Sequence, residues 1–398
     1  MILKYSNIDP EKSSKDEIIE EIKRLNKIKD DNENLQMALK IFINSAYGAI
    51  GNQYFQCYNT DVAEAITAQG QDLLIYAMKS INKYFKDHWH KDTKLHSIMG
   101  ITVSSQVIND VTVYGDTDSV YVSFEEVYKT VDVWHNEKYD PIKFIQLIYK
   151  NRLNEYFIKT HEMYAKKWNT ENLHDFELEA ISYSGIWLAK KKYVLNMAWK
   201  DGGKDGIYFE PQKKIYTKGI ETSQSSYPQF ARDSIYNLIK YIFDNGKDFD
   251  ITVFMNKIKS IKSNFKLQNI ENISLSRSLN DYEKYVLNDR SGLQLESKCP
   301  IQIKAAAIYN FKLNSSKYKN KYNLIKSGNK IKYYYVKGQS KDWEVFGYIQ
   351  GNYPIEIAPD FDYDTMFEHC ILNPINRFMD VIGKVKIPSN LVFTKSLW

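Results

Sequence analysis

The N-terminal part of the chain carries apolar residues at the three- and four-residue spacing of helices. Ser13 or Ser14 can cap a first helix, and the polar cluster at 30–34 predicts its end. A second helix is predicted from about Asn34 and a third over 62–85. The apolar stripe of the second helix consists of Leu35, Leu39, Phe42, Ile43 and Ala46.

The middle of the chain changes to the two-residue alternation of strands. Segments 111–114 and 119–124 are predicted to form two strands joined by the tight turn 115–118. Helical spacing returns at 142–164. Further strands are predicted at 176–182, 185–197 and 208–220.

A new unit is predicted beyond about Ser223. It opens with a helix over 228–243, continues with lysine-rich helices and ends in short strands rich in tyrosine. Helices therefore mix with strands that follow one another through short turns. The predicted fold class is α+β, with a mostly antiparallel sheet and flanking helices.

Composition narrows the class of protein. A chain of 398 residues and 46.8 kDa is long enough for roughly two or three domains. Lys plus Arg (54) exceed Asp plus Glu (49) by 5, which is too small an excess to indicate a polyanionic partner. Three scattered cysteines imply neither a disulfide framework nor a zinc site, and no secretory signal or membrane span is predicted. We therefore expect an intracellular protein with no membrane partner.

The first candidate site is the turn that contains Asp116 and Asp118. At a tight turn between two strands, both carboxylates can point into one small space. They repel each other there unless a divalent cation lies between them, and Mg²⁺ favours one or two carboxylates together with substrate phosphates. Val120 stands where an EF-hand loop needs a third oxygen ligand, which excludes that motif. A polar hairpin turn without a metal is the alternative.

The second candidate is the predicted helix segment 40–48. One face of this helix, opposite the apolar stripe, carries Lys40, Asn44, Tyr47 and Gly51. The ammonium can pair with a phosphate, the amide can form hydrogen bonds, and the phenol ring can lie against a base or a sugar. An ordinary amphipathic helix with a solvated lysine is the alternative.

The third candidate is a basic strand. Alternation sends Lys190 and Lys192 to one face and Lys191 to the other. Tyr193 follows. Such a strand can track a phosphate backbone, or it can be a charged edge strand that resists aggregation. Glu179 and the glutamate two positions before it share a face of the preceding predicted strand, where they can support a metal site or simply face solvent.

The order of these motifs resembles that of family B DNA polymerases. The segment Lys-x-x-x-Asn-Ser-x-Tyr-Gly at 40–48 is similar to motif B on the fingers helix, and Tyr-Gly-Asp-Thr-Asp-Ser at 114–119 is similar to motif C in the palm. The segment at 190–193 resembles the Lys-Lys-Arg-Tyr element, with Lys192 in place of the arginine. The resemblance is strongest over 35–230, and within the family it is closest to the replicative polymerases of T-even bacteriophages.

The resemblance implies a role for each motif. Asp118 is expected to be the principal metal-ligating carboxylate, with Asp116 beside it and Glu179 as an auxiliary carboxylate. Two Mg²⁺ ions are the implied cofactors, and primer–template DNA and dNTPs are the implied partners. The residues expected to surround the incoming nucleotide are Lys40, Asn44, Tyr47 and Gly48. The residues expected to hold the primer–template are Lys190, Lys191, Lys192 and Tyr193, together with Tyr47 at the minor groove.

The resemblance also implies three parts: a partial fingers element over 1–52, a palm over 53–219 and a largely helical thumb over 220–398. Motif A, which carries the other metal-binding aspartate in the family, is not recognisable in the sequence, and neither is a 3′–5′ exonuclease domain. We therefore expect either a naturally split polymerase or a partial gene product. In the first case an N-terminal polymerase half supplies motif A and the exonuclease. In either case we expect that this chain alone does not polymerise.

The last nine residues are apolar for a chain terminus. In phage polymerases this tail docks on the sliding clamp, so the resemblance implies clamp-binding anchors at Phe393, Leu397 and Trp398. A final strand or a packed tail is the alternative. The implied location is the cytoplasm, which is that of the host cell if the protein comes from a phage.

Two other classes of function stay open. A non-catalytic scaffold that holds primer–template DNA is compatible with the same motifs, and it would keep its function when Asp118 is replaced by alanine. A metal-dependent glycosyltransferase can also use Asp116 and Asp118, for a nucleotide sugar. No doubly wound nucleotide-binding pattern supports that class, and steeply salt-dependent binding to primer–template DNA distinguishes the polymerase from it.

Overall fold

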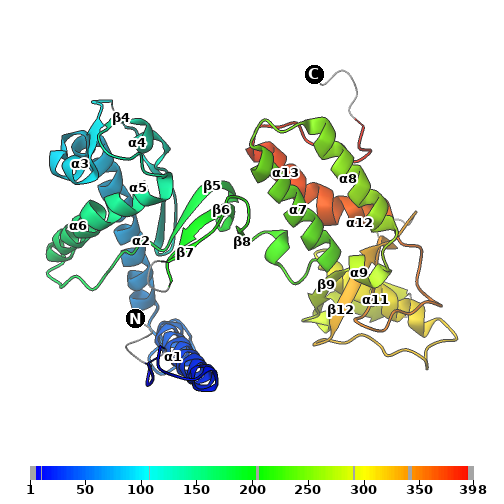
Figure 1. Cartoon of the computed structure of the whole chain (residues 1–398). Coiled ribbons are helices and arrows are strands. Elements are labelled where there is room, and N and C mark those ends of the chain that lie inside the picture. The colour runs from blue at the N-terminus through cyan, green and yellow to red at the C-terminus, as the bar shows by residue number, and fades with distance from the viewer. Residues whose placement is uncertain are drawn as a thin grey trace. The chain divides into compact units, whose positions relative to one another are not determined.

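The computed structural model of the chain describes residues 6–9, 11–106, 108–202, 206–289, 292–338 and 343–392 (Figure 1). The chain divides into two compact units. The first consists of Met1–Glu179 and Lys200–Ile207, and the second of Ala180–Trp199 and Tyr208–Trp398. Helices and small antiparallel sheets occur in both, which confirms the predicted α+β class. Within the described residues, no helix is long and apolar enough to cross a membrane.

Helix α1 (Lys15–Ile50) is continuous, so the predicted helix end at 30–34 is wrong. Ser14, one of the two predicted caps, accepts a hydrogen bond at the N-terminus of the helix. The polar cluster contains neither Gly nor Pro, and Asn32 donates a hydrogen bond from Nδ2 to the Ile28 carbonyl, 2.7 Å away in the same helix. These polar side chains therefore line the surface of one long helix and do not interrupt it.

The first unit packs its other helices around the buried rings of Phe85, Trp89 and Phe144. These helices are α2 (Thr60–Lys83), α3 (Thr93–Met99), α4 (Glu125–Lys129), α5 (Pro141–Ile148) and α6 (Asn154–Lys167). Short turns extend or join them, namely the π-helical η2 (Tyr84–His88) and η4 (Tyr149–Leu153) and the 3-10 turn η3 (Trp89–Lys91). Two antiparallel pairs of strands complete the unit, namely β1 (Ile101–Val103) with β4 (Val131–Trp134), and β2 (Thr112–Asp116) with β3 (Ser119–Val122).

A sheet around β6 (Lys192–Lys200) precedes the helical part of the second unit. This strand pairs with β5 (Ala180–Ala189), β7 (Ile207–Tyr208) and β8 (Ile215–Lys218). The strand predicted over 176–182 starts only at Ala180, and the residues just before it have no regular structure. The alternation of apolar and polar residues therefore begins earlier in the sequence than the hydrogen-bonded strand β5.

The rest of the second unit is mainly helical. Its longer helices are α7 (Gln229–Asn245), α8 (Ile251–Lys266), α11 (Ile301–Asn314) and α13 (Asn373–Val381), and its shorter helices and turns are η5 (Glu221–Ser223), α9 (Ile270–Ile273), α10 (Tyr282–Tyr285), α12 (Tyr363–Phe367) and η7 (Glu368–Leu372). A three-stranded sheet has the order β13 (Val345–Ile349), β12 (Lys330–Tyr335) and β9 (Leu275–Ser278), and β10 (Val286–Asp289) pairs with β11 (Gly292–Leu295). Tyr333, Tyr334 and Tyr348 lie buried in this sheet, which confirms the predicted tyrosine-rich strands.

Candidate functional site

The two candidate aspartates lie at the turn between β2 and β3. Asp116 ends β2 and pairs with Ser119, the first residue of β3. The Asp118 amide and the Ser119 hydroxyl both donate to the Asp116 carbonyl oxygen, at 2.6 and 3.1 Å. Thr117 has a φ of 58°, a left-handed conformation that a β-branched residue adopts only where the surrounding structure enforces it. The predicted hairpin is thus confirmed.

The two carboxylates differ in exposure. Asp116 is 6% exposed, and its Oδ1 accepts a hydrogen bond from the Thr117 hydroxyl at 3.2 Å. Asp118 is exposed. Carboxylate oxygens are hard donors that suit Mg²⁺, and an ion held by one or two carboxylates completes its shell with water and phosphate oxygens. The pair therefore fits part of a magnesium site, which other oxygen ligands have to complete.

The third predicted acidic ligand, Glu179, is exposed and directly precedes β5. Its backbone carbonyl accepts a hydrogen bond from the amide of Asp201 at 2.8 Å. In the described ranges, no group of three or more His, Cys, Asp or Glu side chains is placed to hold a metal ion. The chain thus brings Asp116 and Asp118 together on one turn, and it does not assemble Glu179 with them there.

Helix α1 carries the second candidate on its C-terminal half. Lys40, Asn44 and Tyr47 are exposed and lie three or four residues apart, so they share one face of the helix. A Cβ atom at Gly48 would meet nothing within 4 Å, so this face is open. The sequence predicts Gly51 on the same face, but this residue is the C-cap that ends the helix.

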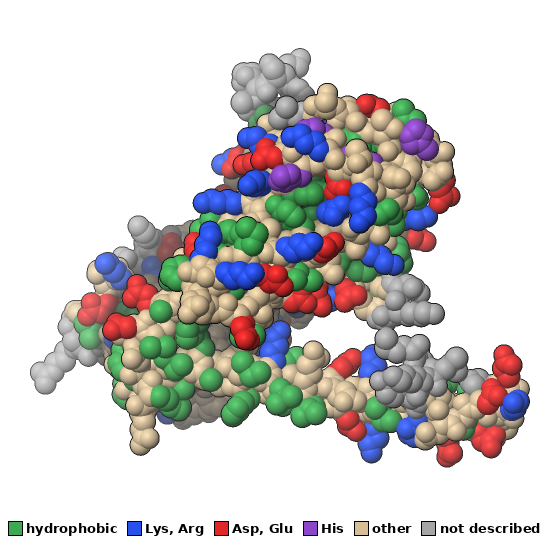
Figure 2. Space-filling model, turned by 90° about the vertical axis from the view of Figure 1, so that its left-hand side faces the viewer, with side chains coloured by type: hydrophobic (Ala, Val, Ile, Leu, Met, Phe, Trp, Pro, Cys, Tyr) green, Lys and Arg blue, Asp and Glu red, His purple; other side chains and the backbone are tan. Residues whose placement is uncertain are grey.

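The apolar stripe on the other side of α1 is also exposed. Phe42 is 76% exposed, and Leu35, Leu39 and Ile43 are exposed as well. Figure 2 shows hydrophobic side chains gathered over one half of this long helix and charged side chains over the other half. A band of this kind is unusual on a protein surface that has no partner.

The third candidate is a turn, so its predicted place inside a strand is wrong. Lys190 and Lys191 form the turn between β5 and β6, with Lys191 at a φ of 62°, and both are exposed. Lys192 begins β6, and the predicted alternation across two faces applies only from there. Tyr193 is 1% exposed and packs beside Trp187, so its ring belongs to the core of the second unit and offers no free face to a base.

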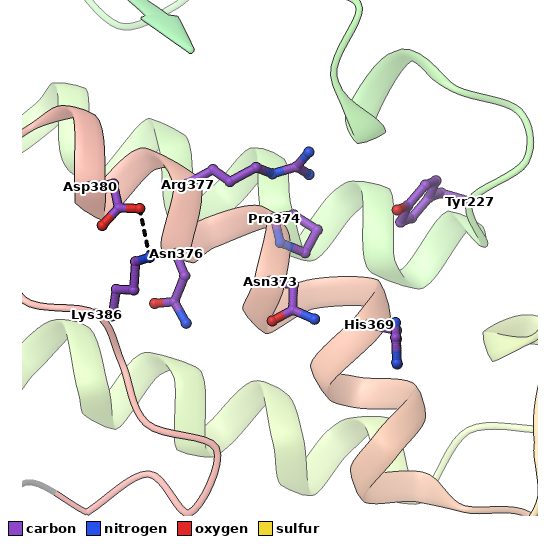
Figure 3. A pocket seen from close by; sticks show the side chains of 8 residues that line it. All are labelled: Tyr227, His369, Asn373, Pro374, Asn376, Arg377, Asp380 and Lys386. Atoms are coloured by element: carbon purple, nitrogen blue, oxygen red, sulfur yellow. Dashed lines mark ion pairs between the residues drawn. The ribbon is translucent and has the colours of Figure 1, made fainter. Parts of the chain in front are cut away.

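A pocket of about 460 Å³ lies beside α13 in the second unit (Figure 3). None of the predicted site residues lines it. Four of its polar side chains are engaged within the unit, in the pairs Arg377 with Glu221, Lys386 with Asp380 at 2.9 Å, and Asn376 with the backbone of Ile387. The pocket is therefore a structural junction that holds the segment after α13. The predicted clamp anchors Phe393, Leu397 and Trp398 lie outside the described residues.

Comparison with known proteins finds a family that the hairpin and α1 resemble. The model of family B DNA polymerases matches residues 11–134, which contain α1, α2, β2 and β3. This segment is similar to family B DNA polymerases. The DNA-directed DNA polymerase of Enterobacteria phage T4 is 29% identical over 284 residues, which are 69% of this chain and 28% of that protein. The protein of the same name from Escherichia phage RB69 is 28% identical over 318 residues, which are 74% of this chain and 32% of that protein.

The similarity to polymerases extends beyond the matched segment. DNA polymerase 1 of Aeropyrum pernix is 24% identical over 301 residues, which are 75% of this chain and 23% of that protein. The chain spans less than a third of the length of each of these relatives. The predicted resemblance to family B DNA polymerases, and to those of phages in particular, is confirmed.

Two residues hold the hairpin against α2, and apolar spacing in the sequence does not single them out. Asn82 of α2 bonds the start of β2, and Gly115 in β2 lies against the same helix. The sequence does contain one indication of this contact. Leu74, Met78 and Asn82 are four residues apart, so they fall on one face of α2. A polar side chain on an otherwise apolar helix face indicates a hydrogen-bond partner on the element that packs against that face.

Proposed function

We propose that this chain forms part of a DNA-directed DNA polymerase that extends a primer by two-metal phosphoryl transfer. The observation that carries the proposal is the hairpin with Asp116 and Asp118, inside the segment that matches family B DNA polymerases. In the reaction the primer 3′-hydroxyl loses its proton and its oxygen attacks the α-phosphorus of a dNTP. A new P–O bond joins the nucleotide to the primer, the bond to the β-phosphate oxygen breaks, and pyrophosphate leaves.

The two aspartates have different tasks in this proposal. Asp118, at the exposed tip of the hairpin, would hold an Mg²⁺ ion, which would neutralise charge on the nucleotide phosphates. Asp116, held almost without exposure at the end of β2, is the more rigid ligand. Bound Mg²⁺ supplies charge neutralisation at the attacking and leaving oxygens. Glu179 is the auxiliary carboxylate near the metal ions in this proposal.

The exposed face of α1 receives the incoming nucleotide in this proposal. The Lys40 ammonium pairs with the triphosphate, which carries most of the charge of the nucleotide. Asn44 and Tyr47 lie one turn further along and contact the nascent base pair, with Tyr47 on its minor-groove side. Gly48 leaves room for close approach. The support for these roles is that all four residues are exposed on one helix.

The turn between β5 and β6 holds the primer–template in this proposal. Lys190 and Lys191 are exposed at the tip of the turn, where their ammonium groups can approach phosphates and the minor groove. Lys192 and the buried Tyr193 fix the base of the turn and keep the two lysines in place. Affinity for duplex DNA should therefore fall steeply with salt concentration.

We also propose that these residues act together with a further polypeptide that brings the metal-binding aspartate of motif A and a 3′–5′ exonuclease. Two features support a partner. The apolar stripe of α1 is exposed, and β2 and β3 form a sheet of two strands among the described residues. In the assembled enzyme we assign residues 1–52 to the fingers, 53–219 to the palm and 220–398 to the thumb.

The C-terminal tail and the location complete the proposal. Phe393, Leu397 and Trp398 anchor the tail on a sliding clamp, and the enzyme works on DNA in the cytoplasm of the host cell. Removing residues 390–398 should leave synthesis on short primers unchanged and abolish stimulation by the clamp. Clamp stimulation that persists without the tail would refute this part.

Primer extension tests the central proposal. The full chain is assayed with Mg²⁺ and four dNTPs, alone and after mixing with a polypeptide that carries motif A and the exonuclease. Synthesis is expected only in the mixture, and Asp118→Ala should reduce it by at least about 10³-fold because the principal metal ligand is lost. Synthesis by the chain alone would contradict the need for a second carboxylate.

A second candidate function is a non-catalytic module that holds primer–template DNA. It is favoured by the lack of a three-residue acidic cluster among the described residues. Under this alternative the mixture does not extend primers, DNA binding persists, and Asp118→Ala binds DNA like the unaltered chain.

A further inference from the structure

Asn82, near the end of α2, bonds the strand that carries Asp116. Its Oδ1 accepts hydrogen bonds from the backbone amides of Val111 and Thr112, both at 3.0 Å. Its Nδ2 donates to the Thr112 hydroxyl at 2.8 Å. One side chain therefore satisfies three polar groups at the point where β2 begins, and an aliphatic side chain of the same size cannot replace it.

These bonds lie at an irregularity in the pairing of β2 with β3. Thr112 pairs with Val122, but Tyr114 pairs with Tyr121, so the register shifts between Thr112 and Tyr114. A bulge of this kind turns the side chains that follow it. A slip by one residue would carry Asp116 to the other face of the strand. Holding the Val111 and Thr112 amides thus fixes the face on which Asp116 lies.

The far end of β2 is held by the same helix. A Cβ atom at Gly115 would lie 2.9 Å from the sulfur of Met78 and 3.4 Å from Cδ2 of Leu74. Glycine therefore lets the strand lie directly on α2, one residue before Asp116. Because Leu74, Met78 and Asn82 are four residues apart, a single face of α2 contacts both ends of the strand.

From this geometry we infer that Asn82 is a positioning residue for the Asp116–Asp118 pair, which it acts on through the register of β2. The inference rests on the proposed function, because it assigns to Asn82 the task of keeping two metal ligands on one face. It predicts that loss of these hydrogen bonds at the start of β2 weakens metal binding at the opposite end of the strand.

Mn²⁺ binding and amide exchange of the full chain test the inference. Free Mn²⁺ is titrated by electron paramagnetic resonance, and hydrogen exchange of residues 111–122 is followed by mass spectrometry. Asn82→Leu, close to the original in volume, is expected to weaken Mn²⁺ binding at least about tenfold and to accelerate exchange in this segment. Asn82→Asp keeps an acceptor for both backbone amides and is expected to restore most of both properties. Asn151→Leu is the matched control, since the Asn151 amide donates to the Leu147 carbonyl of its own helical segment and makes no hydrogen bond to β2 among the described residues.

The outcomes separate this inference from the proposed function. If Asp118→Ala loses Mn²⁺ binding but Asn82→Leu keeps it within about twofold with unchanged exchange, the inference is overturned and the metal site stands. If Asp118→Ala binds Mn²⁺ like the unaltered chain, the metal site of the proposed function fails, and the exchange data alone decide whether Asn82 holds the strand. Should Asn82→Leu not fold, Thr112→Val removes one of the three bonds and is expected to give a smaller loss in the same two measurements. An unchanged Thr112→Val chain would then count against the inference.

Discussion

At the residue scale, a single carboxylate joins three segments of the first unit. Asp92 accepts hydrogen bonds from Nε and Nη2 of Arg152, at 2.5 and 2.7 Å, and from the Tyr84 hydroxyl at 2.9 Å. It also caps α3 by accepting from the amide of Leu95 at 3.1 Å. Tyr84 and Arg152 lie in the π-helical turns η2 and η4, which are often retained where a side chain needs a particular direction.

Replacing Arg152 with methionine is expected to lower the free energy of unfolding by roughly 3 kcal/mol near neutral pH, because a largely buried carboxylate loses its cation. Burial by itself would raise the pKa of Asp92, but the hydrogen bonds from Arg152, Leu95 and Tyr84 outweigh burial and lower this pKa. The stabilisation is therefore present above the ordinary carboxylate pKa of about 3.9, and it is lost as pH falls through the lower folded value. Denaturation curves across the acid range measure this, and a loss that is as large at low pH as at neutral pH would contradict it.

His161 should give the first unit a pH dependence near neutrality. Burial lowers the pKa of this histidine, which lies beside Phe157 and Phe176, and its Nε2 has no hydrogen-bond partner among the residues that the structure describes. The unfolded chain therefore binds a proton more readily, so stability decreases as pH falls below about 6.5. His161→Phe is expected to flatten this decrease in denaturation curves measured near pH 7.5 and 5.5. The control His88→Phe alters an exposed histidine and should leave the slope unchanged, and a slope retained in His161→Phe would contradict the assignment.

At the element scale, the sequence predicts those elements whose local pattern and tertiary packing agree. The strands on either side of Asp116 combine two-residue alternation with a tight turn, and both form as predicted. The end of the first helix at 30–34 does not form, because polar residues without Gly or Pro do not stop a helix. The burial of Tyr193 and the hydrogen bonds of Asn82 depend on residues far away in the sequence, so a local sequence pattern does not predict them.

The contact between β13 and α11 offers a test of packing. A Cβ atom at Gly347 would lie 3.0 Å from the carbonyl carbon of Ala305 and 3.1 Å from its oxygen, so backbone would have to move. Gly347→Ala is expected to destabilise the second unit by about 1–3 kcal/mol. Gly70→Ala is the matched control, since a Cβ atom there meets nothing within 4 Å inside α2, and it should stabilise the first unit by about 0.5–1 kcal/mol. Thermal unfolding of both variants measures the difference, and a neutral Gly347→Ala would show that the sheet can shift.

At the scale of the whole molecule, the apolar stripe of α1 is the surface on which the proposed partner depends. Phe42→Glu should weaken association with the further polypeptide at least about tenfold, since a charge enters the centre of an apolar contact. Unfolding of the isolated chain should change by no more than about 0.5 kcal/mol, because Phe42 is exposed in it. Ile22→Glu, on the N-terminal half of the same helix, is the control. Equal affinities of the two variants in sedimentation or calorimetry would exclude this surface as the interface.

Helix α2 also connects α1 with the acidic hairpin. Nine residues after the end of α1, the Asn59 amide at the start of α2 bonds the Ile50 carbonyl at 2.9 Å, and near its other end α2 holds β2 through Asn82. With 24 residues it is a rod about 36 Å long. A tilt of about 5° at one end would displace the other by about 3 Å. A movement of the helix that carries Lys40 would therefore tilt α2 and displace the acidic hairpin that packs on it.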